Sequence, residues 1–233
     1  MFGAAPLKAE GASIAYDDMA ESWVSRYVHE TITLGFAITE EAVEDNLYDS
    51  LSKRYTKSLA RAMAYTKQVK AAAVLNNAFT SGFNGGDGVV LCSASHPLSP
   101  VNAGSVQSNT AALPLTMDNF ELVRNRMAAW TDDRGQLLGV IPDTVLVPRN
   151  LERSAFQLFS PGARFEPGSA EFNSNLFAGV NVIVWDQLTD GNNWFAVDSR
   201  AMRRHLVWQQ RIALEFAQDG DFDGIAVKYR GYE

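Results

Sequence analysis

The sequence lacks several features that define common classes of protein. It has a single cysteine, Cys92, in 233 residues, which excludes an internal disulfide and a zinc site built on several cysteines. No apolar run approaches the roughly 18 residues that a membrane-spanning helix needs. The first residues, MFGAAPLKAEG, have no basic start followed by an apolar stretch, so no secretory signal is visible. We therefore expect a soluble chain in a reducing compartment.

An excess of positive charge is also missing. Asp and Glu outnumber Lys and Arg by 27 to 20, which gives a net charge of -7 and a pI of about 5.0. Non-specific binding of nucleic acid by the chain as a whole needs clustered Lys and Arg, and an acidic average argues against it without excluding a local basic patch. Apolar residues make up 46% of the chain, which is ordinary for a globular protein of this size.

The segment 12–38 is rich in β-branched and aromatic residues, which favours an extended conformation over a helix. Along WVSRYVHETITLGF, neither set of alternating positions is purely apolar. A strand that covers a globular core has one dry face. The pattern therefore predicts a projecting hairpin with neighbours on both sides, in which ASIAYDDMAESW forms the second arm and the turn lies near 17–21.

A long helix is predicted next. Thr39 can cap a helix start whose first turn carries Glu40 and Glu41, and residues 47–79 contain neither Pro nor Gly. Apolar residues recur there every three to four positions, as on one face of a helix. Its basic residues are Lys53, Arg54, Lys57, Arg61, Lys67 and Lys70, with no acid among them.

The rest of the chain mixes helices and strands. Residues 80–115 have loop composition, Thr116 caps a short amphipathic helix, and DTVLVP at 143–148 predicts a strand followed by a helix that Asn150 caps. Residues 180–198 and 205–232 each predict a hairpin. This order indicates an α+β fold and not a regular βαβ alternation.

The stretch SGFNGGDGVVLCSASHPL, residues 81–98, is the first place to look for chemistry. Its glycines fit neither a Walker loop, which needs a Lys, nor a dinucleotide-binding loop, which lies between a strand and a helix. Cys92 and His96 lie four residues apart, but Pro97 excludes helical geometry there and no third partner is evident. A buried cysteine in a structural loop is the stronger interpretation, and two ligands are too few for a metal site.

Other acidic groups carry no clearer signal. QDGDFD at 218–223 resembles a calcium loop only in its start and is better explained as a hairpin turn. The basic face of the long helix (Lys53, Arg54, Lys57, Arg61) is either a solvated face or a contact surface for nucleic acid or an acidic neighbouring subunit. Because nothing assembles an active site, we expect a structural protein, with no catalytic residue, metal or cofactor.

Taken together, four segments resemble the major capsid proteins of tailed bacteriophages, with the Hong Kong-phage-type fold and within it the Mu-like major head subunit group. They are the hairpin and long helix (12–79), GDGVVLCSASHPL (86–98), DTVLVPRNLERSAFQLF (143–159), and WFAVDSRAMRR followed by IALEFAQDGDFDGIAVKYRGY. In this order they cover almost the whole chain.

The resemblance implies a phage major capsid fold with an extended β-hairpin loop, a long spine helix, and peripheral and axial domains. Residues 1–10 would be the remnant of an N-terminal arm, which is either short or begun upstream, and 11–38 the extended loop. The peripheral domain would comprise 39–80, with the spine helix, and 203–233, with the C-terminal hairpin; 81–202 would be the axial domain.

The resemblance also implies partners. The chain would assemble with itself as pentamers and hexamers in the bacterial cytoplasm, into an icosahedral shell around double-stranded DNA, with scaffold, portal and decoration proteins as further partners. We expect interface residues in the extended loop (Trp23, Arg26, Tyr27, Glu30) and a structural loop at Gly86, Asp87, Gly88, His96 and Pro97. Some relatives crosslink a lysine of the extended loop, but residues 11–38 contain no lysine, so no such crosslink is expected.

Two alternatives stay open at this stage. A cellular compartment shell of the encapsulin type would share the fold and enclose protein cargo instead of DNA. A soluble hydrolase would use Cys92 and His96, and a Cys92→Ala variant with unchanged function would dismiss it.

Overall fold

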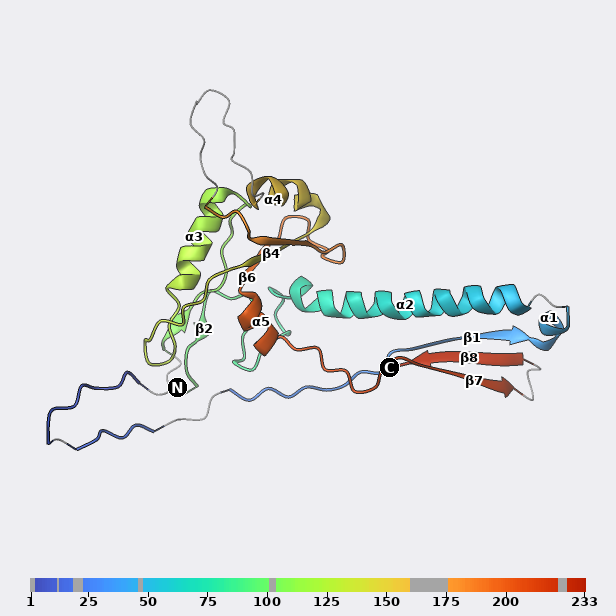
Figure 1. Ribbon diagram of the computed structural model, residues 1–233, viewed down its shortest axis with the longest axis horizontal. Helices are drawn as coiled ribbons and strands as arrows, with labels where there is room; N and C mark the ends of the chain where they lie inside the picture. Colours follow the sequence, from blue (N-terminus) through green and yellow to red (C-terminus); the bar gives the residue numbers. More distant parts are fainter. Residues whose placement is uncertain are drawn as a thin grey trace, which may run out of the picture. The chain divides into compact units, whose positions relative to one another are not determined.

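The computed structural model describes residues 3–11, 13–18, 23–45, 48–100, 104–159, 176–221 and 226–233. The chain divides into two compact units (Figure 1). Unit 1 consists of residues 1–26 and 75–207, and unit 2 consists of residues 27–74 and 208–233. Each unit combines helices with a sheet, so the predicted α+β class is confirmed.

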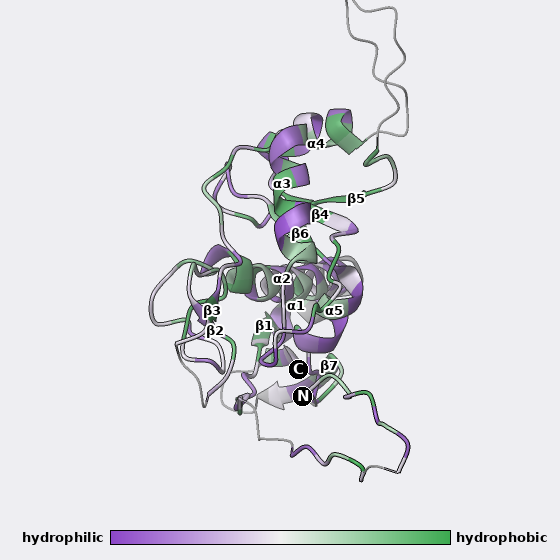
Figure 2. Cartoon of the chain, turned by 90° about the vertical axis from the view of Figure 1, so that its left-hand side faces the viewer, coloured by the Kyte–Doolittle hydropathy of each residue, from purple (hydrophilic) through white to green (hydrophobic). Residues whose placement is uncertain are grey.

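The sheet of unit 1 is built around a strand that is buried on both faces. β4 (Thr144–Val147) lies between β5 (Asn181–Val184), which runs parallel to it, and β6 (Phe195–Val197), which runs antiparallel. All four residues of β4 are buried, which explains its unbroken run of β-branched and aliphatic residues. Figure 2 shows the hydrophobic colouring of this part of the chain around β5.

The helices of unit 1 surround this sheet. They are α3 (Met117–Ala128), η1 (Arg149–Leu151), α4 (Glu152–Phe159) and α5 (Ser199–His205). Phe120 of α3, Val145 and Val147 of β4, and Phe159 of α4 belong to one buried cluster. Leu146 points to the opposite face, where it packs with Leu75 and Leu188. Strand alternation thus sends successive β4 side chains into two separate clusters.

Unit 2 is a long helix with a three-stranded antiparallel sheet. α2 (Tyr48–Asn76), which has its last two residues in unit 1, accompanies β1 (Thr33–Thr39), β8 (Ala226–Tyr232) and β7 (Glu215–Asp221), in the order β1-β8-β7. Gly231 of β8 leaves room for Leu59 of α2, whose Cδ2 would lie 3.6 Å from a Cβ at that position. The short α1 (Glu40–Glu44) follows β1 directly.

Several sequence-based predictions are confirmed. The helix expected at 47–79 is α2, and the helix capped by Thr116 is α3, where the Thr116 hydroxyl accepts from Asn119 N at 3.3 Å. The strand expected at 143–148 is β4. The C-terminal hairpin is formed by β7 and β8, although β7 begins only at Glu215.

The strand pairing predicted within 12–38 is wrong. β1 pairs with β8, in a register that joins Thr33 to Tyr232 and Thr39 to Ala226. Residues 13–18 and 23–32 are assigned to no strand, and residues 12 and 19–22, with most of the expected turn, lie outside the described part. β8 pairs with all seven residues of β1, and Gly35 of β1 allows a close approach, since a Cβ there would lie 2.7 Å from Tyr229 O. The C-terminal strand thus takes the place of the local arm.

Two smaller predictions also need correction. Residues 180–198 do not form a hairpin, because β5 and β6 are both paired to β4 and β4 separates them. Asn150 does not cap the helix after β4. The helical turn already starts after Pro148, whose φ of -70° and ψ of 164° end the strand, and Asn150 lies inside η1.

Candidate functional site

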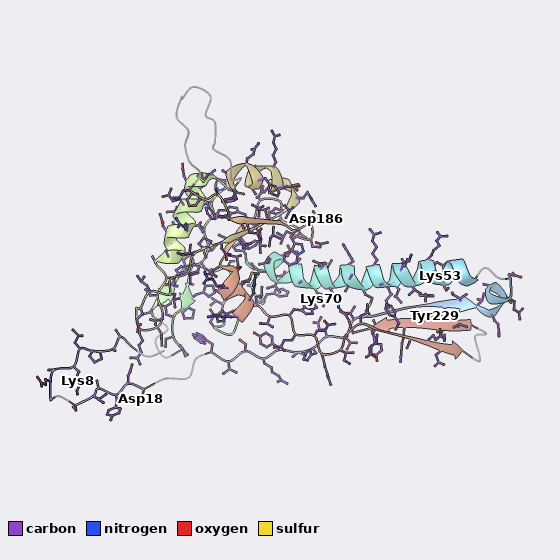
Figure 3. All side chains as sticks on the ribbon, viewed as in Figure 1. Lys8, Asp18, Lys53, Lys70, Asp186 and Tyr229 are labelled. Atoms are coloured by element: carbon purple, nitrogen blue, oxygen red, sulfur yellow. The ribbon has the colours of Figure 1, made fainter. Side chains whose placement is uncertain are left out.

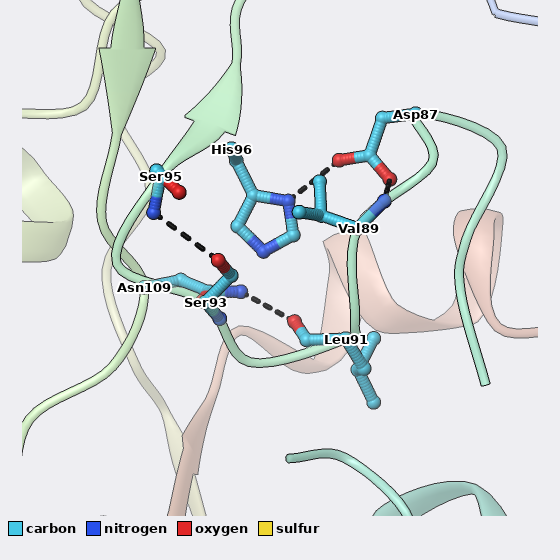
Figure 4. Close-up of polar contacts among 7 residues, drawn as sticks. All are labelled: Asp87, Val89, Leu91, Ser93, Ser95, His96 and Asn109. Atoms are coloured by element: carbon cyan, nitrogen blue, oxygen red, sulfur yellow. Dashed lines mark hydrogen bonds and ion pairs between the residues drawn. The ribbon is translucent and has the colours of Figure 1, made fainter. Parts of the chain in front are cut away.

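Several short-range hydrogen bonds hold the loop at 81–98 together, and Figure 4 shows part of this network. Gly85 N donates to Val89 O at 2.7 Å, and Gly88 N donates to Gly85 O at 3.1 Å. Gly88 has φ of +80°, a conformation that side chains with a Cβ rarely adopt. The glycines therefore shape a turn, as the sequence predicted, and β2 (His96–Pro97) leaves the loop paired with β3 (Val106–Gln107).

Asp87 and His96 are hydrogen-bonded to each other inside this loop. His96 Nδ1 lies 2.6 Å from Asp87 Oδ2, and the other carboxylate oxygen accepts from Val89 N at 3.2 Å. Both side chains are largely covered, with 18% of Asp87 and 23% of His96 exposed. The second ring nitrogen, Nε2, is buried and has no hydrogen-bond partner among the described residues. No sequence pattern indicated this pairing, because nine residues separate the two side chains.

Cys92 is a half-buried structural residue. Its backbone N donates to Ala78 O at 2.8 Å, which ties the loop to the end of α2. Burial raises the pKa of the Cys92 thiol to about 11, the opposite of what a nucleophile needs. Its side chain lines an aromatic cavity of about 910 Å³ in unit 1, whereas His96 is turned to Asp87 and does not line that cavity. This arrangement does not support a Cys–His catalytic pair.

The structure brings two of the predicted sets together within unit 1. A Cβ on Gly86 would lie 2.3 Å from Ser25 Oγ and 3.7 Å from Trp23 Cβ. The segment around Trp23 therefore lies directly against the loop. This close contact is possible because Gly86 has no side chain. The sequence predicted Trp23 and Gly86 as separate features and could not connect residues 63 positions apart.

The remaining residues predicted for the extended loop are exposed. Tyr27 is 68% and Val28 79% exposed, although both are large and apolar. Glu30 pairs with Lys70 Nζ of α2, which holds the pKa of the Glu30 carboxyl below its usual value by a hydrogen bond and by charge. Arg26 is exposed. Residues 23–31 thus present apolar side chains and are assigned to no strand, whereas Ile32 exchanges backbone hydrogen bonds with Glu233 at 3.0 and 3.1 Å.

The basic face of α2 is exposed, at Lys53, Arg54, Lys57 and Arg61. Lys53 and Lys57 border a shallow hollow with Gln218 and Tyr229. Figure 3 labels Lys53 and Tyr229. Farther along the helix the charge is compensated. Lys67 lies beside the carboxylate of Glu233, and Lys70 beside that of Glu30.

One basic cluster was missed by the sequence argument. Arg200, Arg203 and Arg204 of α5 are exposed, and Asp198 caps that helix by accepting from Arg200 N at 2.9 Å and Ala201 N at 3.1 Å. The signal was present in the sequence, since no acid occurs between Asp198 and Glu215.

Neither a metal centre nor a membrane span is found in the described part of the chain. Residues 3–11, 13–18, 23–45, 48–100, 104–159, 176–221 and 226–233 contain no group of three His, Cys, Asp or Glu side chains that could hold an ion. Among the same residues, no helix has the length and apolar character required to cross a bilayer.

Comparisons with known proteins agree with this arrangement. The capsid of bacteriophage JBD30 is similar in fold, with a TM-score of 0.50 at 14% identity over 73% of this chain and 82% of that one. The JBD30 capsid decorated with minor capsid protein trimers gives a TM-score of 0.52 at 14% identity over 79% and 82%.

No curated protein matches the sequence. A family model described as phage capsid protein matches residues 23–233, which includes the extended segment, the long helix, the loop at 81–98 and the C-terminal hairpin. The chain therefore belongs to the phage capsid protein family and is a structural subunit of the virion shell.

Proposed function

We propose that copies of this chain associate as pentamers and hexamers and close into an icosahedral shell around double-stranded DNA. Its work is assembly through many modest contacts, which multivalent closure makes stable as a whole. The observation that carries this proposal is the extended segment at 23–32, whose exposed Tyr27 and Val28 have no cover within the described chain. A second copy that lies on both sides of the segment would cover them.

The proposed division assigns 11–38 to the extended loop, 81–202 to the axial domain, and 39–80 with 203–233 to the peripheral domain. The two compact units support the axial and peripheral assignments, since unit 1 contains residues 75–207 and unit 2 contains 27–74 and 208–233. They divide the extended loop, because residues 1–26 belong to unit 1. Trp23, Arg26, Tyr27 and Glu30 would then contact an adjacent subunit. The loop with Gly86, Asp87, Gly88, His96 and Pro97 would hold the base of the extended loop through the Ser25 contact.

The basic face of α2 is proposed to contact DNA in the lumen or an acidic surface of a neighbouring subunit. Replacing Lys53, Arg54, Lys57 and Arg61 together by glutamine should impair assembly or DNA retention. Normal DNA-filled particles from this variant would refute the assignment. Assembly in the host cytoplasm and contacts with scaffold, portal and decoration proteins belong to the same proposal.

Negative-stain microscopy of the purified protein tests the central claim. Closed shells are expected, and a monodisperse monomer under all assembly conditions would overturn it. Nuclease-protected DNA inside particles purified from infected cells separates a phage head from a compartment that encloses protein cargo. The family assignment favours the phage head over the compartment.

The shell is proposed to mature without a lysine crosslink in its extended loop, because residues 11–38 contain no lysine. Whole particles boiled in detergent should run as a single band at the mass of one subunit on denaturing electrophoresis. A ladder of covalent oligomers would contradict this.

A further inference from the structure

The helix α5 has two faces of opposite character. Met202 packs against the buried cluster of Leu75, Leu146 and Leu188, and Ala201 and His205 line the cavity of unit 1. Arg203 and Arg204 follow Arg200 by three and four residues, so all three lie on the other face of the helix. We call these three residues the arginine face.

The arginine face is exposed and uncompensated. None of the three guanidinium groups forms an ion pair with another residue that the structure describes, in contrast to Lys67 and Lys70 of α2. The nearest acid in sequence, Asp198, is committed to the backbone N–H groups of Arg200 and Ala201. Like charges three or four residues apart repel each other and destabilise the helix.

Stabilisation of the helix dipole does not explain the cluster. Basic side chains are favourable in the last turn, which accounts for Arg203 and Arg204. Arg200 is in the first turn, where the same dipole disfavours a positive charge. The arrangement therefore points to an external anion that meets all three groups at once.

We propose that the arginine face binds the phosphate backbone of the double-stranded DNA enclosed by the shell. A guanidinium group matches the geometry of phosphate oxygens and remains charged at any physiological pH. Leu206 and Val207, which follow the helix, are exposed as well, but the three guanidinium groups themselves leave no apolar centre of the kind that a protein–protein interface buries. This favours nucleic acid over the acidic surface of a second copy. The inference rests on the proposed enclosure of DNA and assigns the contact to unit 1, apart from the basic face of α2.

The test compares two variants of the full chain with equal loss of charge. The first is Arg200→Gln with Arg203→Gln and Arg204→Gln. The control is Lys8→Gln with Arg126→Gln and Arg153→Gln, which removes three scattered exposed charges of the same unit. Binding of a short fluorescent duplex of arbitrary sequence is followed by anisotropy at increasing salt concentration, and particles from both variants are imaged.

The first variant should bind the duplex on the order of tenfold more weakly at low salt, and the slope of log K against log salt should fall by about two to three, since each phosphate contact contributes roughly 0.9. The control should match the wild type, and all three proteins should form shells with equal melting temperatures. Equal weakening by both variants would overturn the inference, because net charge alone would then account for binding. Unchanged DNA binding with lost shell formation would overturn it in favour of an interface between copies. Absence of shells from the wild type would instead refute the proposed function.

Discussion

The two units differ in how completely each buries its own apolar surface. In unit 1, Phe120, Val145 and Val147 are fully buried around a central strand that is covered on both faces. In unit 2, Leu59 and Met63 of α2 are buried, but Tyr55 and Tyr65 of the same helix are 46% and 62% exposed. Both buried apolar clusters lie in unit 1, which therefore has the core of an independent domain. Among the described residues, unit 2 buries only Ile38, Leu59, Met63 and Ala72 as apolar side chains. We infer that unit 1 carries the stability of the free chain and that unit 2 gains most from assembly.

The largest expected effect comes from removing the centre of the unit 1 core. Phe120 packs edge-to-face on Phe159 and Phe177, with ring centroids 4.8 and 5.1 Å away. Phe120→Ala should lower the free energy of unfolding by about 3–5 kcal/mol, because it leaves a cavity that close-packed neighbours cannot fill. Denaturant titration followed by tryptophan fluorescence measures the loss.

The matched control for this change is Phe156→Ala in the same unit. Phe156 is 52% exposed on α4, so its removal should cost less than half as much. If both variants lost the same free energy of unfolding, the stability of unit 1 would not depend on the buried cluster around Phe120.

The next effect concerns the charge pair that joins α2 to the end of β8. Glu233 has only 5% of its side chain exposed, and Oε2 has Lys67 Nζ beside it but no hydrogen-bond partner among the described residues. Lys67→Met would leave that carboxylate buried and uncompensated, and it should destabilise unit 2 by about 2 kcal/mol. Thermal unfolding followed by circular dichroism at the helix signal would detect it.

Lys70→Met is the paired control, one helical turn farther along α2. Its partner Glu30 has 68% of its side chain exposed, so solvent already screens the pair and no measurable loss is expected. If the two lysine variants have the same melting temperature, the pair with Glu233 does not stabilise unit 2. The expected difference between a buried and an exposed ion pair would then be absent.

How far the sequence predicted this molecule depended on whether the information was local. The period of apolar residues in α2 and the Thr116 cap of α3 are local signals, and both were predicted correctly. The pairing of β1 with β8 joins residues that are nearly 200 positions apart, and no local pattern specifies such a partner. The same limit hid the parallel pairing of β4 with β5 behind an apparent hairpin.

The candidate site shows the same division. That the glycines at 81–98 form a structural turn could be argued from composition and spacing, and Gly88 has the positive φ that this requires. The contact of Gly86 with Ser25 and the pairing of Asp87 with His96 arise only when the chain folds back on itself. The arginine face of α5 was readable in the sequence as a run without acids, but its significance depends on which side of the helix is buried.

A smaller effect is expected from replacing a glycine in the loop of unit 1 than from the changes above, and a glycine in strand β7 of unit 2 provides the comparison. Gly88→Ala places a Cβ on a residue with φ of +80° and should cost about 1 kcal/mol, although no atom lies within 4 Å of that Cβ. Gly220→Ala in β7 meets equally open space without a positive φ, and it should be neutral or slightly stabilising because the unfolded chain loses freedom. Melting temperatures of the two variants provide the measurement, and a larger loss at Gly220 than at Gly88 would contradict the conformational argument.

The last prediction uses Cys92 as a reporter that is confined to unit 1. Burial raises the pKa of its thiol from 9.0 to about 11, so the thiolate fraction at pH 8 is lower by about 100-fold than in the unfolded chain. Alkylation of the native protein by iodoacetamide at that pH should therefore be slow, and its rate should rise with pH towards 11.

In the Lys67→Met variant, warmed until unit 2 has lost its helix signal, Cys92 should stay protected, because its cavity is lined by unit 1 alone. In Phe120→Ala the thiol should react at lower temperature than in the wild type. Simultaneous exposure of Cys92 and loss of the α2 signal in every variant would show that the two units unfold together, and the contrast between a self-sufficient unit 1 and an assembly-dependent unit 2 would then not hold in the free chain.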